Sequence, residues 1–139
     1  MTRPFIRNQP QRILICGDRH WTNYNLLRNV LQQHLAPAHD IIIHGDARGA
    51  DRMGAEIAKQ LGVTKDRILA YPADWTKHHK AAGPIRNRQM LTEGNPTLVL
   101  AFHGDIRSSK GTKDMVNIAL RAGLQVWLNG LLLQNERKK

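Results

Sequence analysis

Short apolar runs that alternate with amphipathic stretches constrain the fold of this chain more than any other feature. Each run is short and closed by glycine, proline or a polar turn, which is typical of a buried strand. The stretches between them place apolar residues three and four positions apart, which is typical of helices packed on one side. We expect strands at 12–16, 41–44, 67–71, 97–102 and 125–128, and helices at 23–35, 50–61, from Pro84 onward and at 111–122.

This alternation indicates parallel strands joined by right-handed helical crossovers. The fold class that follows is α/β, a three-layer sandwich with about five parallel strands. A chain of 139 residues is long enough for one domain with a real core. We expect that domain at 12–133, with a last packing turn after Gly130, between a flexible basic arm at 1–11 and a charged tail at 134–139.

Composition limits the cellular environment and the kinds of partner that we expect for this chain. The single cysteine, Cys16, excludes a disulfide framework within the chain and a multi-cysteine zinc site, and it ends an apolar run, so we expect it to be buried. The adjacent pair His78-His79 is weak evidence for a metal site, and we expect neither metal nor cofactor. No apolar run approaches the roughly 20 residues that span a bilayer. These features favour a cytoplasmic protein without membrane contact.

The charge balance favours an anionic partner. The formal net charge is +10, and residues 13–135 still carry 15 basic and 10 acidic side chains. Nucleic acid and small phosphorylated molecules both fit this excess. Aromatic residues make up only 5% of the chain, which counts against a nucleic-acid surface built on base stacking.

Ligands of open parallel sheets bind beyond the carboxyl ends of the strands. In this sequence that rule selects four loops, at 17–22, 45–51, 72–84 and 103–112. In the first loop, Gly17 lets backbone approach a ligand, and Arg19 can fork onto a phosphate or carboxylate. A plain strand-to-helix turn, with Trp21 against the sheet, is the alternative.

The second loop joins a strand to a helix through two glycines, Gly45 and Gly49, so its N–H groups can face an anion. Asp51 falls in the first helical turn, where it can be an N-cap. Asp46 lies between the glycines, where it can oppose a phosphate or hold Arg48 or Lys110.

In the third loop we expect Arg86 and Asn87 in the first turn of the helix that starts at Pro84. Arg86 would grip a phosphate there, and the alternative is that it braces the loop by pairing with Asp74 or Asp51. Asn87 can read a hydroxyl or a base edge. We expect residues 77–80 to form a solvated basic turn.

The fourth loop ends in Gly111-Thr112 at a helix start, and it also holds small hydroxyl side chains. Such a turn describes a phosphate cradle, although Thr112 can equally be an N-cap alone.

The segments ILICGDRHW, IIIHGDARGAD, YPADW, KAAGPIRNRQM and GTKDMVNIA, in this order, resemble the YspA/YpsA-related branch of the SLOG superfamily. The match covers about residues 13–126. The resemblance implies a Rossmann-like fold, a nucleotide or nucleotide-derived ligand, a homodimer, and occurrence in phages and mobile elements. The implied ligand-binding residues are Gly17, Arg19, Gly45, Arg48, Gly49, Asp51, Arg86, Asn87, Gly111 and Thr112.

The superfamily also contains LOG phosphoribohydrolases, which carry a glutamate three residues after the threonine of their GT turn. Met115 occupies that place here, and Asp114 comes one residue earlier. Our main hypothesis is therefore a binding domain for a nucleotide-type small molecule. The alternative is a hydrolase of the N-glycosidic bond that uses Asp114, Asp51 or Asp46 as its carboxylate, in falling order. A second and weaker alternative is a DNA-binding protein of the DprA-like kind. The apolar run 131–133 is the candidate contact of a homo-oligomer.

Overall fold

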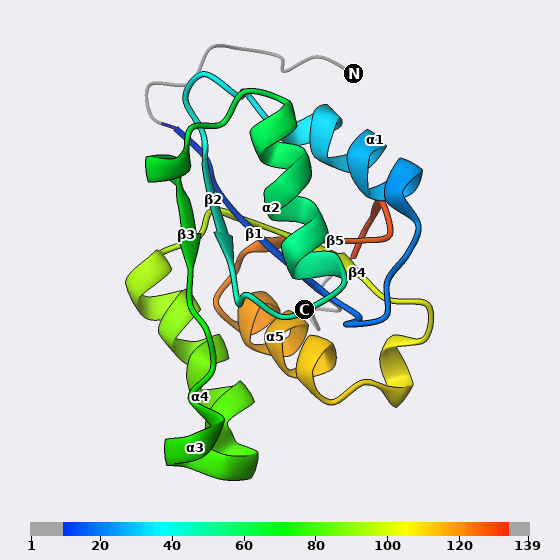
Figure 1. Ribbon diagram of the computed structural model, residues 1–139. Helices are drawn as coiled ribbons and strands as arrows, with labels where there is room; N and C mark the ends of the chain where they lie inside the picture. The colour runs from blue at the N-terminus through cyan, green and yellow to red at the C-terminus, as the bar shows by residue number, and fades with distance from the viewer. Residues whose placement is uncertain (1–9, 134–139) are drawn as a thin grey trace.

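The structure is a computed structural model that describes residues 10–133. The expected arm at 1–11 lies almost wholly outside these residues, as does the expected tail at 134–139. The strands are β1 (Arg12–Gly17), β2 (Ile41–His44), β3 (Ile68–Ala70), β4 (Leu98–Phe102), β5 (Gln125–Leu128) and β6 (Leu131–Leu132). The helices are α1 (Tyr24–His34), α2 (Ala50–Gln60), α3 (Trp75–His78), α4 (Ala82–Gln89) and α5 (Gly111–Arg121). Figure 1 shows their arrangement.

The sheet has the strand order β3-β2-β1-β4-β5-β6, and its first five strands are parallel. This confirms the predicted α/β sandwich with about five parallel strands, and the order is that of a Rossmann-like fold. Because the chain returns to β4 after β3, the strand order reverses between β1 and β4. The loops that follow these two strands therefore open at the switch point, where such sheets bind ligands.

The prediction of a packing turn after Gly130 is wrong, because the chain forms β6 there, antiparallel to β5. Asn129 and Gly130 have φ angles of 51° and 88°. Two positive φ angles in succession make the tight turn that joins antiparallel strands. Trp127 thereby pairs with Leu132.

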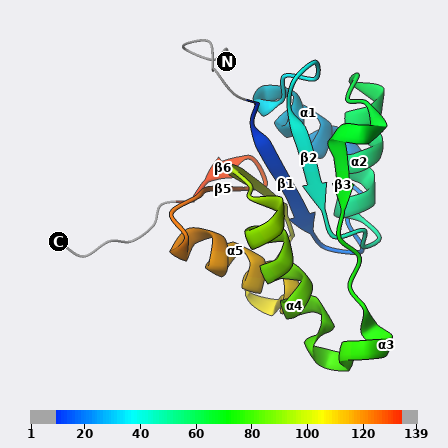
Figure 2. The same ribbon diagram turned by 90° about the vertical axis from the view of Figure 1, so that its left-hand side faces the viewer.

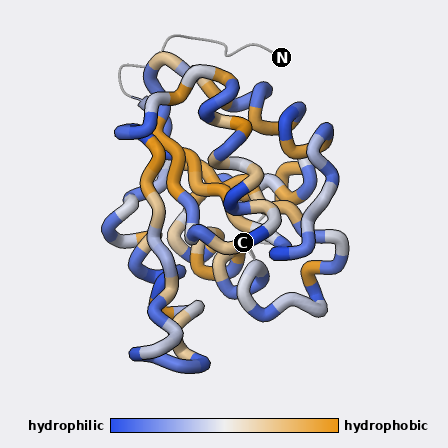
Figure 3. The backbone as a smooth tube through the Cα atoms, in the orientation of Figure 1, coloured by the Kyte–Doolittle hydropathy of each residue, from blue (hydrophilic) through white to orange (hydrophobic). Residues whose placement is uncertain are grey.

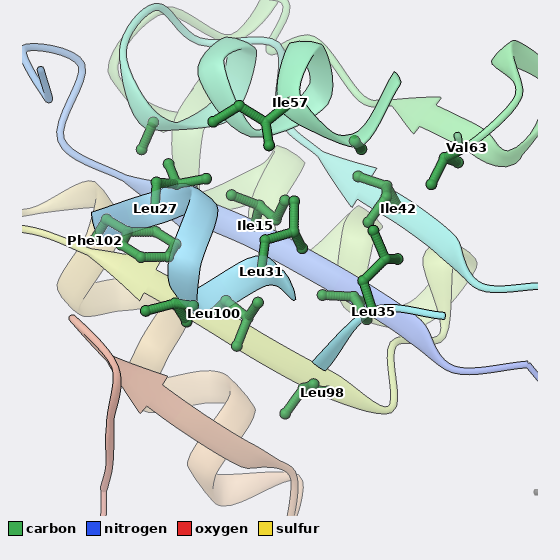
Figure 4. Close-up of a cluster of buried hydrophobic side chains, with 14 residues drawn as sticks. Ile15, Leu27, Leu31, Leu35, Ile42, Ile57, Val63, Leu98, Leu100 and Phe102 are labelled. Carbon is green, nitrogen blue, oxygen red and sulfur yellow. The ribbon is translucent and has the colours of Figure 1, made fainter. Parts of the chain in front are cut away.

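Two apolar cores cover the two faces of the sheet (Figure 2). Ile13 and Ile15 of β1 pack in the core beneath α1 and α2, whereas Leu14 and Cys16 pack in the core beneath α5 and the helical turn Met90–Gly94 that follows α4. Figure 4 shows side chains of the first core. Figure 3 shows that the central strands are strongly hydrophobic, as expected where helices cover both faces.

Two helix starts differ in how well the sequence predicts them. Asn23 caps α1, since its side chain accepts a hydrogen bond from the Leu26 N–H at 3.1 Å. In contrast, α4 starts at Ala82 and not at Pro84. Proline is tolerated in a first turn because the N–H it lacks would have no intrahelical partner there. Arg86 is consequently the fifth residue of α4, so the prediction that it lies in the first turn is wrong.

Among residues 10–133, no helix is long and apolar enough to cross a bilayer.

Candidate functional site at the carboxyl edge of the sheet

The first and second loops lie directly against each other. Gly49 has φ 76°, and a Cβ atom there would meet the carbonyl oxygen of Arg19 at 2.6 Å. The Asp18 carbonyl accepts hydrogen bonds from the Ala50 and Trp21 N–H groups, each at 3.1 Å. Only a glycine fits this conformation and this approach. The contact places Arg19 beside the residue that follows Arg48.

Arg19 and Arg48 are both exposed. Within residues 10–133, neither guanidinium has a hydrogen-bond or ion-pair partner. The two loops thus present two free cations from segments about thirty positions apart in the sequence.

Gly17 joins the first loop to the end of β4. The Asp18 N–H donates to the Phe102 carbonyl at 2.8 Å, and a Cβ atom on Gly17 would collide with that carbonyl and approach Ala50 Cβ to 2.8 Å. The close approach that Gly17 allows is therefore between its own backbone and the end of β4. Trp21 lies against Phe102 with ring centroids 5.7 Å apart, so it packs on the sheet end, as the alternative interpretation of this loop had it.

Asp51 binds the backbone of the second loop with its buried carboxylate. Its buried carboxylate accepts hydrogen bonds from the Gly45 N–H at 2.8 Å and the Ala47 N–H at 3.4 Å, and it does not cap α2. The alternative in which Asp51 is an N-cap is therefore wrong. Burial raises the pKa of Asp51 to about 6, although the Arg86 charge and the two N–H groups oppose that rise.

Arg86 lies across Gly45. Its Nη1 donates to the Gly45 carbonyl at 2.6 Å, and its Nε donates to Asn87 Oδ1 at 3.1 Å. A Cβ atom on Gly45 would fall 2.7 Å from the guanidinium carbon, so the glycine makes room for this arginine. Arg86 thus braces the second loop, but through a carbonyl and not through Asp74 or Asp51.

Asn87 continues this network to α5. Its buried Nδ2 donates to Asp114 Oδ2 at 3.0 Å and to the Gly111 carbonyl at 3.2 Å. Hydrogen bonds therefore run without interruption from Asp114 through Asn87 and Arg86 to Gly45 and Asp51. We call these five residues the buried network. Its hydrogen bonds connect the second loop, α4 and the start of α5.

The start of α5 is open. The hydroxyl of Ser109 accepts from the Thr112 N–H at 3.0 Å, so Ser109 satisfies one N–H group of this helix end and Thr112 is not its cap. Thr112 is buried, whereas Gly111 is exposed, and a Cβ atom on Gly111 would meet nothing within 4 Å. Our sequence reasoning did not single out Ser109, although a serine three residues before a helical position is a known start signal.

The three candidate catalytic carboxylates each have partners. Asp46, with φ 58°, accepts from Arg52 Nε at 3.1 Å and not from Arg48 or Lys110. Asp51 is buried. Asp114 accepts from Asn87 and from Arg88 Nη1 at 3.4 Å, and its side chain keeps 24% exposure. Of the three, Asp114 lies nearest to the open turn at Gly111.

Two other titratable groups are buried near this edge. Cys16 is buried as expected, and burial raises the pKa of its thiol, to which the nearby Asp51 charge adds. Burial lowers the pKa of His44, whose Nδ1 accepts from the Asp46 N–H at 2.9 Å. A search of residues 10–133 finds no group of three His, Cys, Asp or Glu side chains that could hold a metal ion.

Comparison with known proteins places the chain in a family. Residues 11–78 match the family described as YspA, cpYpsA-related SLOG family. The Gene 61 protein of Mycobacterium phage D29 is 33% identical over 122 residues, which cover 84% of this chain and 94% of the phage protein. A phage relative fits the expected occurrence in phages. The family match includes the two loops that meet at Gly49, and the phage protein aligns over most of the domain, so the chain belongs to the YspA, cpYpsA-related SLOG family.

Proposed function

We propose that this chain binds a nucleotide or a nucleotide-derived phosphorylated ligand at the carboxyl edge of the sheet, with its phosphate between Arg19 and Arg48. The observation that carries the proposal is the contact of Gly49 with the Arg19 backbone. This contact brings together two exposed arginines that have no partner among residues 10–133. Guanidinium groups in this state can bind phosphate in a two-pronged, charge-assisted manner.

The start of α5 supports the same location. In the described part of the chain, the N–H groups of Gly111 and Lys113 have no hydrogen-bond partner, and the space around Gly111 is open. Free N–H groups at the start of an 11-residue helix favour an anion. The helix follows β4 and the first loop follows β1, so both lie at the switch point.

The buried network has a different proposed role. Arg86 and Asn87 hold the second loop and the start of α5 at a fixed separation, so the site is formed before the ligand binds. Arg86 Nη2 has no partner within residues 10–133 and can donate to the ligand while Nη1 and Nε hold the loop. Such preorganisation lowers the entropic cost of binding.

Calorimetric titration tests the proposal. We expect wild-type protein to bind at least one member of a panel of mononucleotides, NAD, ADP-ribose and cyclic dinucleotides, and to bind the matching nucleoside more weakly. Each of Arg19→Gln and Arg48→Gln should weaken the phosphorylated ligand about ten- to a hundredfold, which is typical of one charge-assisted contact.

Arg121→Gln is the matched control, because Arg121 is an exposed arginine at the opposite end of α5. It should leave the affinity unchanged. Absence of binding at millimolar ligand, or equal losses in all three variants, would refute the proposal.

N-glycosidic hydrolysis is a second candidate function, favoured by the partly exposed Asp114 next to the open Gly111 turn. A carboxylate in this place could stabilise an oxocarbenium-like centre. Chromatography of AMP incubated with the protein would show free adenine, and Asp114→Asn should abolish its release. Intact AMP would remove this candidate without affecting the binding proposal.

We also propose a homodimer. Leu131 and Leu132 of β6 are exposed, with 73% of Leu131 accessible. Light scattering at high micromolar concentration tests this, and a monomer there would refute it.

A further inference from the structure

A basic projection extends beyond the carboxyl edge of the sheet. It consists of residues 75–88, which form α3, a short helical turn at His79–Ala81 and most of α4. Figures 1 and 2 show that α3 lies beyond the end of β3, beside the start of α4 and away from α1 and α2. A segment in this position is accessible to a partner larger than a nucleotide.

Trp75 stands out on this projection because it is 58% exposed. The rim of its indole faces the first turn of α4, since Trp75 Cη2 is 3.6 Å from the place of a Cβ atom on Gly83. The adjacent Ile85 is also 42% exposed. One edge of the indole is thus supported by the helix, while more than half of the side chain remains available. A supported and exposed aromatic ring is a platform on which another flat ring can stack.

Basic side chains outnumber acidic ones around Trp75. Residues 75–88 hold four Lys or Arg side chains and no Asp or Glu. The preceding Asp74 accepts from the Lys77 N–H at 3.1 Å, so its carboxylate is used to cap α3. Lys77 and Lys80 are exposed and have no partner among residues 10–133. An anionic partner would therefore meet two unpaired cations here, opposed by the single carboxylate of Asp74.

We propose that this projection binds single-stranded nucleic acid, with a base stacked on Trp75 and neighbouring phosphates at Lys77 and Lys80. Single strands offer unpaired bases and regularly spaced phosphates, and sequence-tolerant proteins bind them with this combination of aromatic rings and cations. A protein partner would match the exposed apolar groups but would need an acidic surface as well. The inference does not depend on the proposed nucleotide site.

Fluorescence anisotropy of a labelled oligothymidylate about twenty nucleotides long tests whether a base stacks on Trp75. We expect wild-type protein to bind it, and Trp75→Ala to weaken binding about five- to a hundredfold. Trp75→Phe, which keeps a flat ring, should recover much of that loss. Tyr24→Ala is the matched control, because Tyr24 is an exposed aromatic on α1. It should bind like wild type.

Salt dependence tests the phosphate contacts. The logarithm of the association constant should fall linearly with the logarithm of salt concentration. For the double variant Lys77→Gln, Lys80→Gln the slope should be shallower by about 1.4, as expected for two single-strand phosphate contacts. The control double variant Lys65→Gln, Arg121→Gln removes two exposed cations elsewhere and should keep the wild-type slope.

The outcomes separate this inference from the nucleotide site. Arg48→Gln should leave oligothymidylate affinity unchanged, and Trp75→Ala should leave mononucleotide affinity unchanged. The inference is overturned if wild type does not bind the oligonucleotide, or if Trp75→Ala and Tyr24→Ala bind it equally. It is also overturned if Trp75→Ala disrupts an oligomer while the lysine variants bind normally, because the projection is then a protein interface. Quenching of wild-type tryptophan fluorescence by the oligonucleotide provides a readout that needs no variant.

Discussion

Arg86 and Arg48 lie on the same edge of the sheet, but their surroundings differ. Arg86 is half-buried, and its Nη1 and Nε donate to Gly45 and Asn87. Arg48 is exposed and has no partner in the described chain. Both belong to motifs that the sequence analysis assigned to ligand binding. One set of motif residues therefore builds the edge, while another is left free at its surface.

The glycines of this edge divide in the same way. Gly49 is required by its positive φ and by the Arg19 backbone, and Gly45 is required by the Arg86 guanidinium. Gly111 has open space around it. No neighbouring atom explains the glycine at position 111, so a bound ligand can be what needs the space there.

The largest expected effect is the loss of stability in Gly49→Ala. An alanine at φ 76° is strained, and its methyl group would collide with the Asp18 and Arg19 backbone. We expect a loss of about 3 kcal/mol in the free energy of unfolding, measured by urea denaturation. Gly111→Ala should cost less than about 0.5 kcal/mol, because its methyl group meets only open space. Equal losses in the two variants would show that Gly49 and Gly111 do not differ in what the fold requires of them.

A second prediction concerns pH and Asp51. Its pKa is about 6 in the folded protein and about 3.8 in the unfolded chain. Because the folded state holds the proton more tightly, this group stabilises the protein fully below pH 4, and the contribution is lost as the pH rises to 6. Relative to Asp51→Asn, wild type should therefore lose about 2–3 kcal/mol between pH 4 and pH 7.

Denaturation of both proteins across that pH range measures this difference. Asp105→Asn removes an exposed carboxylate of the fourth loop and is the matched control, so its stability should run parallel to that of wild type. A parallel course for Asp51→Asn as well would show that Asp51 is not the buried acid described here.

A smaller effect is expected for Arg86→Lys. A lysine has a single ammonium group and cannot donate to Gly45 and Asn87 in the same planar geometry. We expect about 1 kcal/mol lower stability, as for one net hydrogen bond. Arg88→Lys is the control, because Arg88 is exposed and its charge is retained. Thermal unfolding measures both, and an unchanged Arg86→Lys would show that the brace contributes nothing to the fold.

Local pattern was sufficient to predict most of the fold. The run at 41–44 is buried by helices on both faces, so its hydrophobicity marked β2 residue for residue. The Asn129-Gly130 pair is a hairpin signal that our reading of the sequence did not use, and β6 was missed for that reason.

The candidate site was harder to predict because its contacts cross the chain. The loops themselves followed from the strand ends, but the partner of Arg86 lies 41 residues away, and no local pattern indicates it. The exposure of Trp75 was also unpredictable, since an aromatic residue beside a strand end is ordinarily expected to pack.

The most direct test of the proposed site is a backbone amide NMR titration with AMP or with the tightest ligand from the calorimetric panel. We expect shifts at residues 17–20, 48–50 and 111–113, where the free arginines and the open start of α5 lie. Residues 64–67 and 94–97, at the opposite edge of the sheet, should stay unchanged. Shifts confined to that opposite edge, or saturation without any change at the three loops, would contradict the account.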